Sequence, residues 1–168
     1  MGYPMAGHLA CEGHEVCVYD RDPALAERWC SEFGGECAGT PREAAGDAEL
    51  LITRFEDAEH LRAVLTGCDG AFAGMHTGGL LIDHSLISAD VAREIASLAA
   101  SHGLDFLDAP ACENHTDSQG AAQSGLLRLL VGGEATCYAR AEPVLDSYAL
   151  ACKLMGPVGS GQQGRLTL

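Results

Sequence analysis

Positively charged residues are scarce in this sequence. Ten lysine and arginine residues stand against 24 aspartate and glutamate residues, so the formal net charge of the 168-residue chain is −14. A protein that binds nucleic acid or anionic lipid uses basic residues to displace the counterions of the phosphates, and a strongly acidic protein has few of them. The charge balance therefore argues against nucleic acid and against an anionic membrane surface as partners.

Long apolar segments are missing as well. No run of about eighteen apolar residues, the length that spans a bilayer as a helix, occurs in the sequence. The first residues also lack the charged segment and the apolar segment of a secretion signal. We therefore expect a cytoplasmic protein that has no membrane partner.

Paired cysteine motifs are absent, although the chain has eight cysteines. These are scattered through the predicted helices and strands, which is typical of reduced, mostly buried thiols. One loop offers Cys112, Glu113, His115 and Asp117 as possible metal ligands, with His115 as a possible base for a Cys112 nucleophile. Because zinc sites usually use two such pairs and no third group orients the histidine, the sequence favours a solvated loop and no metal site.

Helix and strand patterns alternate along the chain, which has few aromatic residues (5%) but a hydrophobic content of 47%. Apolar runs bounded by polar residues predict buried parallel strands, whereas residues 111–124 form a long loop without periodicity. The alternation predicts one α/β domain over residues 1–168, with a doubly wound, mostly parallel sheet. Strands are expected at residues 15–20, 36–38, 49–53, 80–83, 105–108, 126–131 and 151–155, and helices mainly at 23–33, 57–65, 88–102 and 135–148.

The first twenty residues have the pattern of the second half of a dinucleotide-binding βαβ unit. A helix pattern begins at Gly2 and ends at Gly13, and Asp20 closes the following strand eighteen residues after Gly2. In such units a glycine at the helix start allows close packing of helix and strand, and the acid binds ribose hydroxyls. The first strand and the first two glycines of the Gly-x-Gly-x-x-Gly turn would precede Met1, so we expect a Rossmann-type sheet that lacks its first strand.

Short motifs in a fixed order carry a family resemblance over nearly the whole chain. They are Met1 to Ala6, Gly13 to Val16, Val18 to Arg21, Pro41 to Ala45, Ile82 to Ser88, Phe106 to Pro110, Val131 to Gly133 and Gly156 to Gln162. In these motifs the sequence resembles the β-hydroxyacid dehydrogenases, the family of 3-hydroxyisobutyrate dehydrogenase and 6-phosphogluconate dehydrogenase.

The resemblance implies a domain that binds NAD or NADP at the carboxyl ends of its strands. The implied cofactor residues are Gly2, Asp20, Arg21, Asp57 and Ser85. Asp20 would bind the ribose hydroxyls and so favour NAD, while the neighbouring Arg21 keeps NADP possible. The loops that carry Asp57 and Ser85 would flank the cofactor.

The sequence departs from the family pattern at the parts that act on substrate. Residues 112–115 replace the Ser-Gly-Gly loop that receives the substrate carboxylate, with about three extra residues, and place an acid there. Arg165 stands where the family has its acid–base lysine, and a guanidinium holds charge but does not exchange protons near neutral pH. The sequence ends at Leu168, before the helical domain that the family has next.

Two functions of different classes remain open. The chain is either the cofactor domain of an NAD(P)-dependent oxidoreductase acting on a small 3-hydroxy acid, impaired as it stands, or a degenerate binding or interaction module on the same fold. An in-frame strand and glycine turn in the DNA upstream of Met1 would favour the first, and a stop codon the second.

The missing first strand should leave two open strand edges. We expect residues 16–19 to pair directly with residues 50–52, or the chain to self-associate as a homo-oligomer.

Overall fold

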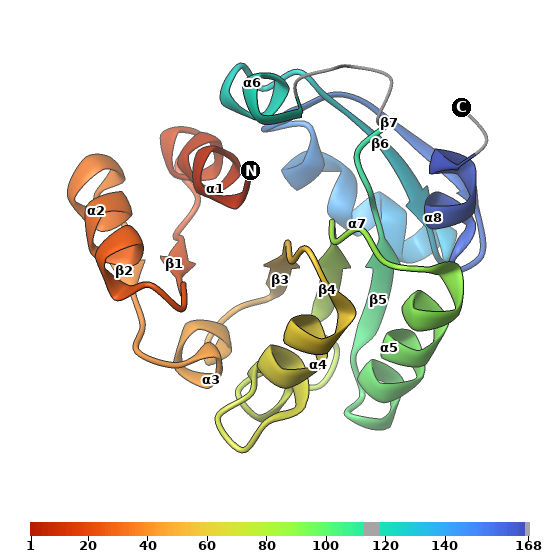
Figure 1. Cartoon of the computed structure of the whole chain (residues 1–168), viewed down its shortest axis with the longest axis horizontal. Coiled ribbons are helices and arrows are strands. Elements are labelled where there is room, and N and C mark those ends of the chain that lie inside the picture. The colour runs from red at the N-terminus through yellow and green to blue at the C-terminus, as the bar shows by residue number, and fades with distance from the viewer. Residues whose placement is uncertain (113–117, 167–168) are drawn as a thin grey trace.

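A computed structural model of the chain describes residues 1–112 and 118–166 (Figure 1). Its helices are α1 (Gly2–Cys11), α2 (Pro23–Phe33), α3 (Pro41–Ala45), α4 (Ala58–Thr66), η1 (Ala71–Ala73), α5 (Ala89–Ser101), α6 (Ser118–Gln123), α7 (Ala135–Leu145) and α8 (Ser160–Arg165). Its strands are β1 (Cys17–Val18), β2 (Glu36–Cys37), β3 (Leu50–Thr53), β4 (Leu80–Asp83), β5 (Asp105–Asp108), β6 (Leu127–Gly132) and β7 (Ala149–Gly156). No helix within the described ranges is long and apolar enough to cross a membrane.

The strands form a five-stranded sheet in the order β3-β4-β5-β6-β7 and a separate two-stranded sheet of β1 and β2 (Figure 1). Each pair is parallel except β5 with β6. The predicted mostly parallel α/β sheet is therefore confirmed. The carboxyl ends of β3, β4 and β5 lie at one edge of the larger sheet, whereas the candidate cavity borders the smaller sheet, where Val18 of β1 lines it.

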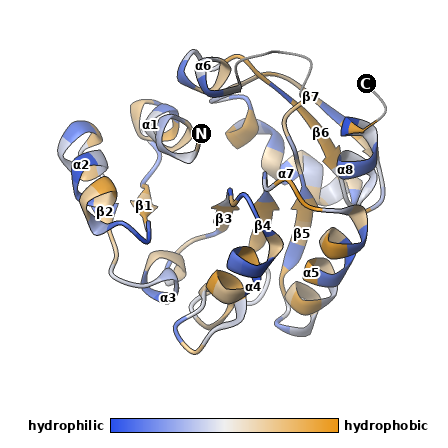
Figure 2. Cartoon of the chain, viewed as in Figure 1, coloured by the Kyte–Doolittle hydropathy of each residue, from blue (hydrophilic) through white to orange (hydrophobic). Residues whose placement is uncertain are grey.

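Two apolar cores cover the two faces of the larger sheet. Leu80 and Ile82 of β4 face one core, which also takes Met5 and Leu9 of α1 and the buried side of α7. Leu81, between them in sequence, faces the other core, which is closed by α4 and α5. This alternation along one strand is the geometry of a doubly wound sheet. In Figure 2 the strands are mostly hydrophobic, and the outer sides of the helices are mostly hydrophilic.

The expected pairing of residues 16–19 with residues 50–52 is wrong, because β1 pairs only with β2 and β3 only with β4 among the described residues. Helix α1 is held in place on both sides. The Trp29 indole donates to the carbonyl of Tyr3 at 3.1 Å, and the His8 ring bonds the carbonyl of Ala122 on α6 at 3.0 Å. Joining β1 to β3 would break these contacts.

Local capping explains where the helices begin. Asp22, Thr40, Asp57 and Ser88 each accept a backbone N–H of the helix that follows. Four expectations differ from the structure: α6 begins within the loop predicted at residues 111–124, the strand at 15–20 is only Cys17–Val18, α7 ends at Leu145, and the strand at 151–155 extends over Ala149–Gly156.

Candidate functional site

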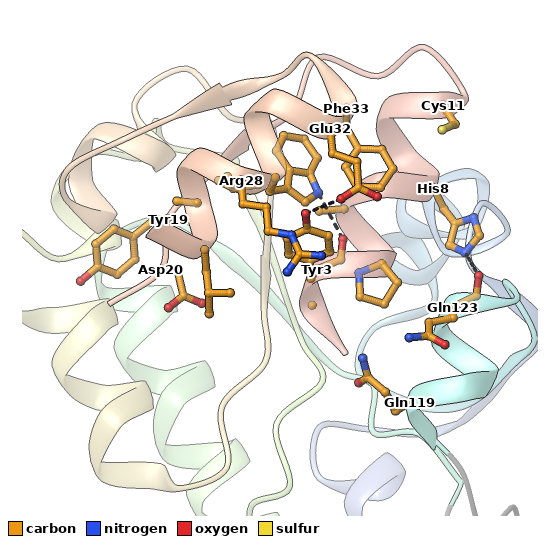
Figure 3. Close-up of a pocket in the computed structure, with 18 residues that line it drawn as sticks. Tyr3, His8, Cys11, Tyr19, Asp20, Arg28, Glu32, Phe33, Gln119 and Gln123 are labelled. Carbon is orange, nitrogen blue, oxygen red and sulfur yellow. Dashed lines mark hydrogen bonds between the residues drawn. The ribbon is translucent and has the colours of Figure 1, made fainter. Parts of the chain in front are cut away.

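A cavity of about 620 Å³ lies between α1, α2 and α6 (Figure 3). Its lining includes Gly2 at the start of α1 and Asp20 at the end of the β1 segment, so two residues that the sequence predicted for the cofactor share one cavity. The Asp20 carboxylate is exposed, and within the described part of the chain it accepts the backbone N–H of Asp22, at 2.9 Å. The carboxylate can therefore accept hydrogen bonds from the hydroxyl groups of a ligand.

The close packing expected at Gly2 occurs at Gly7 instead. A Cβ added at Gly7 would lie 2.6 Å from Cζ of Phe33, so α1 and α2 approach each other there only because the side chain is absent. A Cβ added at Gly2 would meet nothing within 4 Å. The start of α1 thus borders open space, into which its unpaired backbone N–H groups can bind an anion.

An aromatic and charged wall closes one side of the cavity, and sequence reasoning missed it. The Tyr3 hydroxyl donates to Glu32 at 2.6 Å, and the Arg28 guanidinium lies 5.9 Å from the centre of the Tyr3 ring (Figure 3). Arg28 and Glu32 are four residues apart on α2, which places them on one helix face. That spacing was the available signal, but nothing local showed that Tyr3 lies opposite.

Arg21 and Asp57, both predicted for the cofactor, are joined through His60. The Arg21 Nη1 lies 2.7 Å from Nε2 of His60, and Nδ1 of His60 lies 2.6 Å from Oδ2 of Asp57. Asp57 also accepts the His60 backbone N–H at 2.8 Å, and this bond lowers the pKa of the Asp57 carboxyl below its usual value. The chain of three side chains connects the end of the β1 segment to the start of α4.

Ser85, the remaining predicted cofactor residue, is fully buried. Its hydroxyl donates to Asp83 at 2.6 Å and accepts the backbone N–H of Phe55 at 2.8 Å, while Thr53 also donates to Asp83 at 2.7 Å. These bonds fasten the loop after β3 to the loop after β4. The role of Ser85 toward a cofactor stays a prediction, and it would require these bonds to rearrange.

Two buried titratable residues follow each other at the carboxyl end of β4. Burial raises the pKa of Asp83 to about 6, against the hydrogen bonds of Ser85 and Thr53, which lower it. Burial also lowers the pKa of His84 to about 4. The neutral His84 ring donates from Nδ1 to the Ala109 carbonyl at 2.6 Å, and its Nε2 accepts the Tyr148 hydroxyl at 3.0 Å.

Helix α8 is docked onto the same edge of the sheet by Asp108. The Asp108 carboxylate accepts the backbone N–H groups of Gly159 at 2.7 Å and Gln162 at 2.9 Å. The Gln162 side chain then donates to the carbonyl of Ser85 at 2.8 Å. Arg165, the residue predicted in place of the catalytic lysine, lies half-buried in the last turn of this helix.

The loop considered for metal binding lies mostly outside the described residues, which include Cys112 but not Glu113, His115 or Asp117. Burial raises the pKa of the Cys112 thiol, which disfavours the thiolate that a nucleophile needs. Across residues 1–112 and 118–166, no three His, Cys, Asp or Glu side chains form a group suited to a metal ion.

Comparison with known proteins identifies relatives along the whole chain. The chain is 36% identical over 166 residues to a 3-hydroxyisobutyrate dehydrogenase of Pseudomonas aeruginosa, an alignment that covers 99% of this chain and 54% of that protein. It is 41% identical over 162 residues to an uncharacterized oxidoreductase of Shewanella frigidimarina, with 96% of this chain and 54% of the relative covered. The chain thus spans about half the length of these relatives.

A solved structure of a relative has the same fold as this chain. A structure of Mycobacterium tuberculosis 3-hydroxyisobutyrate dehydrogenase with L-serine has a TM-score of 0.91 and 32% identity, and the match covers 99% of this chain and 55% of that one. This confirms the Rossmann-type fold. Residues 1–156 also match the family described as the NAD binding domain of 6-phosphogluconate dehydrogenase. The resemblance seen in the motifs is therefore confirmed: the chain belongs to this NAD-binding family, which also confirms the expected dinucleotide cofactor.

Proposed function

We propose that the chain is the cofactor domain of an oxidoreductase that acts on a small 3-hydroxy acid. The observation that carries this proposal is the shared cavity of Gly2 and Asp20, which places a helix start suited to an anion and an exposed carboxylate along one surface. The names of the relatives suggest the substrate class. The expected cytoplasmic location stays part of the proposal.

The residues present fit a dinucleotide. The Asp20 carboxylate would accept the adenosine ribose hydroxyls, and the N–H groups at the start of α1 would bind phosphate oxygen. The bound cofactor supplies hydride transfer at its nicotinamide ring, and the protein supplies position and charge. Arg165 would hold negative charge near the carboxyl ends of β4 and β5, where Gln162 of the same helix contacts the loop after β4.

The first test is the effect of Asp20→Asn on binding of NAD and NADP, measured by NMR titration. We expect the dissociation constant for NAD to rise about fivefold, because a hydrogen bond to a charged acceptor is replaced by one to a neutral acceptor. NADP should weaken less or bind better, since the carboxylate no longer repels the 2′-phosphate. Asp47→Ala, at an exposed aspartate that does not line the cavity, is the control. Equal effects of Asp20→Asn on both nucleotides would contradict the proposed role of Asp20.

One observation favours the second candidate, a binding module without turnover. Arg165 occupies the position that the resemblance assigns to the acid–base lysine, and a guanidinium remains protonated at physiological pH. Such a module would keep dinucleotide binding but lack proton exchange with the substrate hydroxyl. Nucleotide binding without turnover would support this candidate.

A further inference from the structure

The donors and acceptors along the three side chains of Arg21, His60 and Asp57 fit one tautomer of the His60 ring. Oδ2 of Asp57 lies 2.6 Å from Nδ1 of His60 and can only accept, so Nδ1 carries the proton. In the neutral ring Nε2 then has a lone pair, which accepts an N–H of Arg21 at 2.7 Å. Asp57 is itself held by the backbone N–H of His60, so the Asp57 end of this series of hydrogen bonds is fixed at the start of α4.

This arrangement turns the Arg21 guanidinium toward α4. The neighbouring Asp20 carboxylate forms none of the ion pairs found among the described residues, and it keeps its charge toward the cavity. An arginine released from His60 has Asp20 as a nearby acid to neutralise. Its planar group of five N–H donors is also the geometry that binds phosphate oxygens.

We propose that His60 is a positioning residue that holds Arg21 away from Asp20 and thereby favours NAD over NADP. The inference rests on the proposed function, since it concerns the adenosine end of the same cofactor site. A 2′-hydroxyl meets an unneutralised acceptor in Asp20, whereas a 2′-phosphate meets a repelling carboxylate and an arginine that is already bound to His60. His60 contributes to the choice without touching the nucleotide.

The size of the effect follows from the exposure of the bonds. The side chains of His60 and Asp57 are 46% and 50% exposed, so each bond is weakened by water. Removing His60 should therefore change the ratio of the two dissociation constants by about three- to fivefold.

The test uses the 168-residue chain and NMR titrations with NAD and with NADP. His60→Ala should improve NADP binding relative to NAD by about three- to fivefold. His60→Gln, which retains an oxygen to accept the Arg21 N–H, should keep the wild-type ratio. His14→Ala, at an exposed histidine outside the cavity, is the matched control. Thermal unfolding of each variant separates these effects from a loss of fold.

A second background distinguishes positioning from a general structural effect. If His60 acts through Arg21, His60→Ala should not change the ratio in a chain that already carries Arg21→Ala. The same change in that background would overturn the inference, as would an unchanged ratio in the single variant. If the wild-type chain binds neither nucleotide, the proposed function fails and the inference with it, whereas binding of both with an unchanged ratio overturns the inference alone.

Discussion

Asp83 and His84 are adjacent buried residues whose pKa values are shifted in opposite directions. Because the folded chain binds the Asp83 proton more tightly than the unfolded chain, the stability that this proton contributes is present below about pH 4 and is lost as the pH rises through about 6. The neutral His84 ring contributes stability above about pH 6.5, which is lost as the pH falls through about 4. The two contributions oppose each other over the same pH range, and each amounts to about 3 kcal/mol.

We expect Asp83→Asn to separate the two contributions. As the pH rises from 4 to 6.5, the unfolding free energy of this variant should increase by up to about 3 kcal/mol relative to that of the wild-type chain, because the variant has no buried carboxyl to ionise. Over the same rise in pH, the unfolding free energy of His84→Asn should decrease relative to that of the wild-type chain. Urea unfolding at several pH values measures both, with the exposed Asp90→Asn as control. Parallel stability curves for Asp83→Asn and the wild-type chain would show that Asp83 does not titrate as described.

Among the elements, β1 and β3 are end strands of the two sheets, and like β2 and β7 each has a strand partner on one edge only within the described residues. A strand edge without a partner exposes N–H and C=O groups that can pair with another chain. Both strands are short and parallel to their partners, and Val16, Leu50 and Ile52 near them are only partly buried. The arrangement suits a parallel strand placed between the two sheets, leading into α1.

An added upstream segment tests this arrangement. We expect the 168-residue chain to bind NAD with a dissociation constant of about 1 mM or weaker, roughly 4 kcal/mol of binding free energy, and to self-associate. A β-branched strand ending in Gly-x-Gly before Met1 should tighten NAD binding at least about tenfold and yield a monomer, because it fills both edges and adds phosphate-binding amides. A glycine–serine segment of equal length is the control. NAD titration and light scattering provide the measurements, and equal affinity of the two extended chains would contradict the expectation.

As a whole molecule, the chain combines a candidate cofactor cavity with Arg165 on α8, the helix that Asp108 docks at the carboxyl ends of the strands. Its net charge of −14 makes long-range attraction of an anionic substrate unfavourable. Attraction of the proposed 3-hydroxy acid substrate would therefore depend on local cations such as Arg54 and Arg165, at the ends of β3 and α8. Arg54 donates to the carbonyl of Phe55 at 2.6 Å.

We expect the 168-residue chain to show no NAD(P)-dependent oxidation of 3-hydroxyisobutyrate. Arg165 does not exchange a proton with the substrate hydroxyl, so hydride transfer lacks its acid–base group. The measurement is the absorbance of the reduced nicotinamide, with the Pseudomonas aeruginosa relative as a positive control. A rate above the protein-free background that is lost in Arg165→Ala would show that the chain is a working dehydrogenase.

Local sequence patterns were sufficient for much of the fold. The 3.6-residue and two-residue periodicities, the caps at Asp22 and Ser88, and the motif order predicted the alternating elements, the mostly parallel sheet and the family. These features depend on residues that are close in sequence, and such residues determine helix starts, strand faces and turns. The location of Asp20 just beyond a strand was predictable for the same reason, and the motif also assigned Asp20 and Gly2 to one cofactor, but the lining of their cavity by α2 and α6 was not predictable.

Contacts between distant segments were accessible only from the folded chain. His60 meets Arg21 across 39 positions, and the Phe55 backbone bonds Ser85 across 30, because β1, β3 and β4 end at one side of the molecule. The tertiary structure also determines that the Ser85 hydroxyl bonds Asp83 and Phe55. Burial in that structure shifts the pKa values of Asp83 and His84 in opposite directions. The separation of β1 from β3 was decided by the packing of α1 against α2 and α6, a balance of many long-range contacts that no local pattern contains.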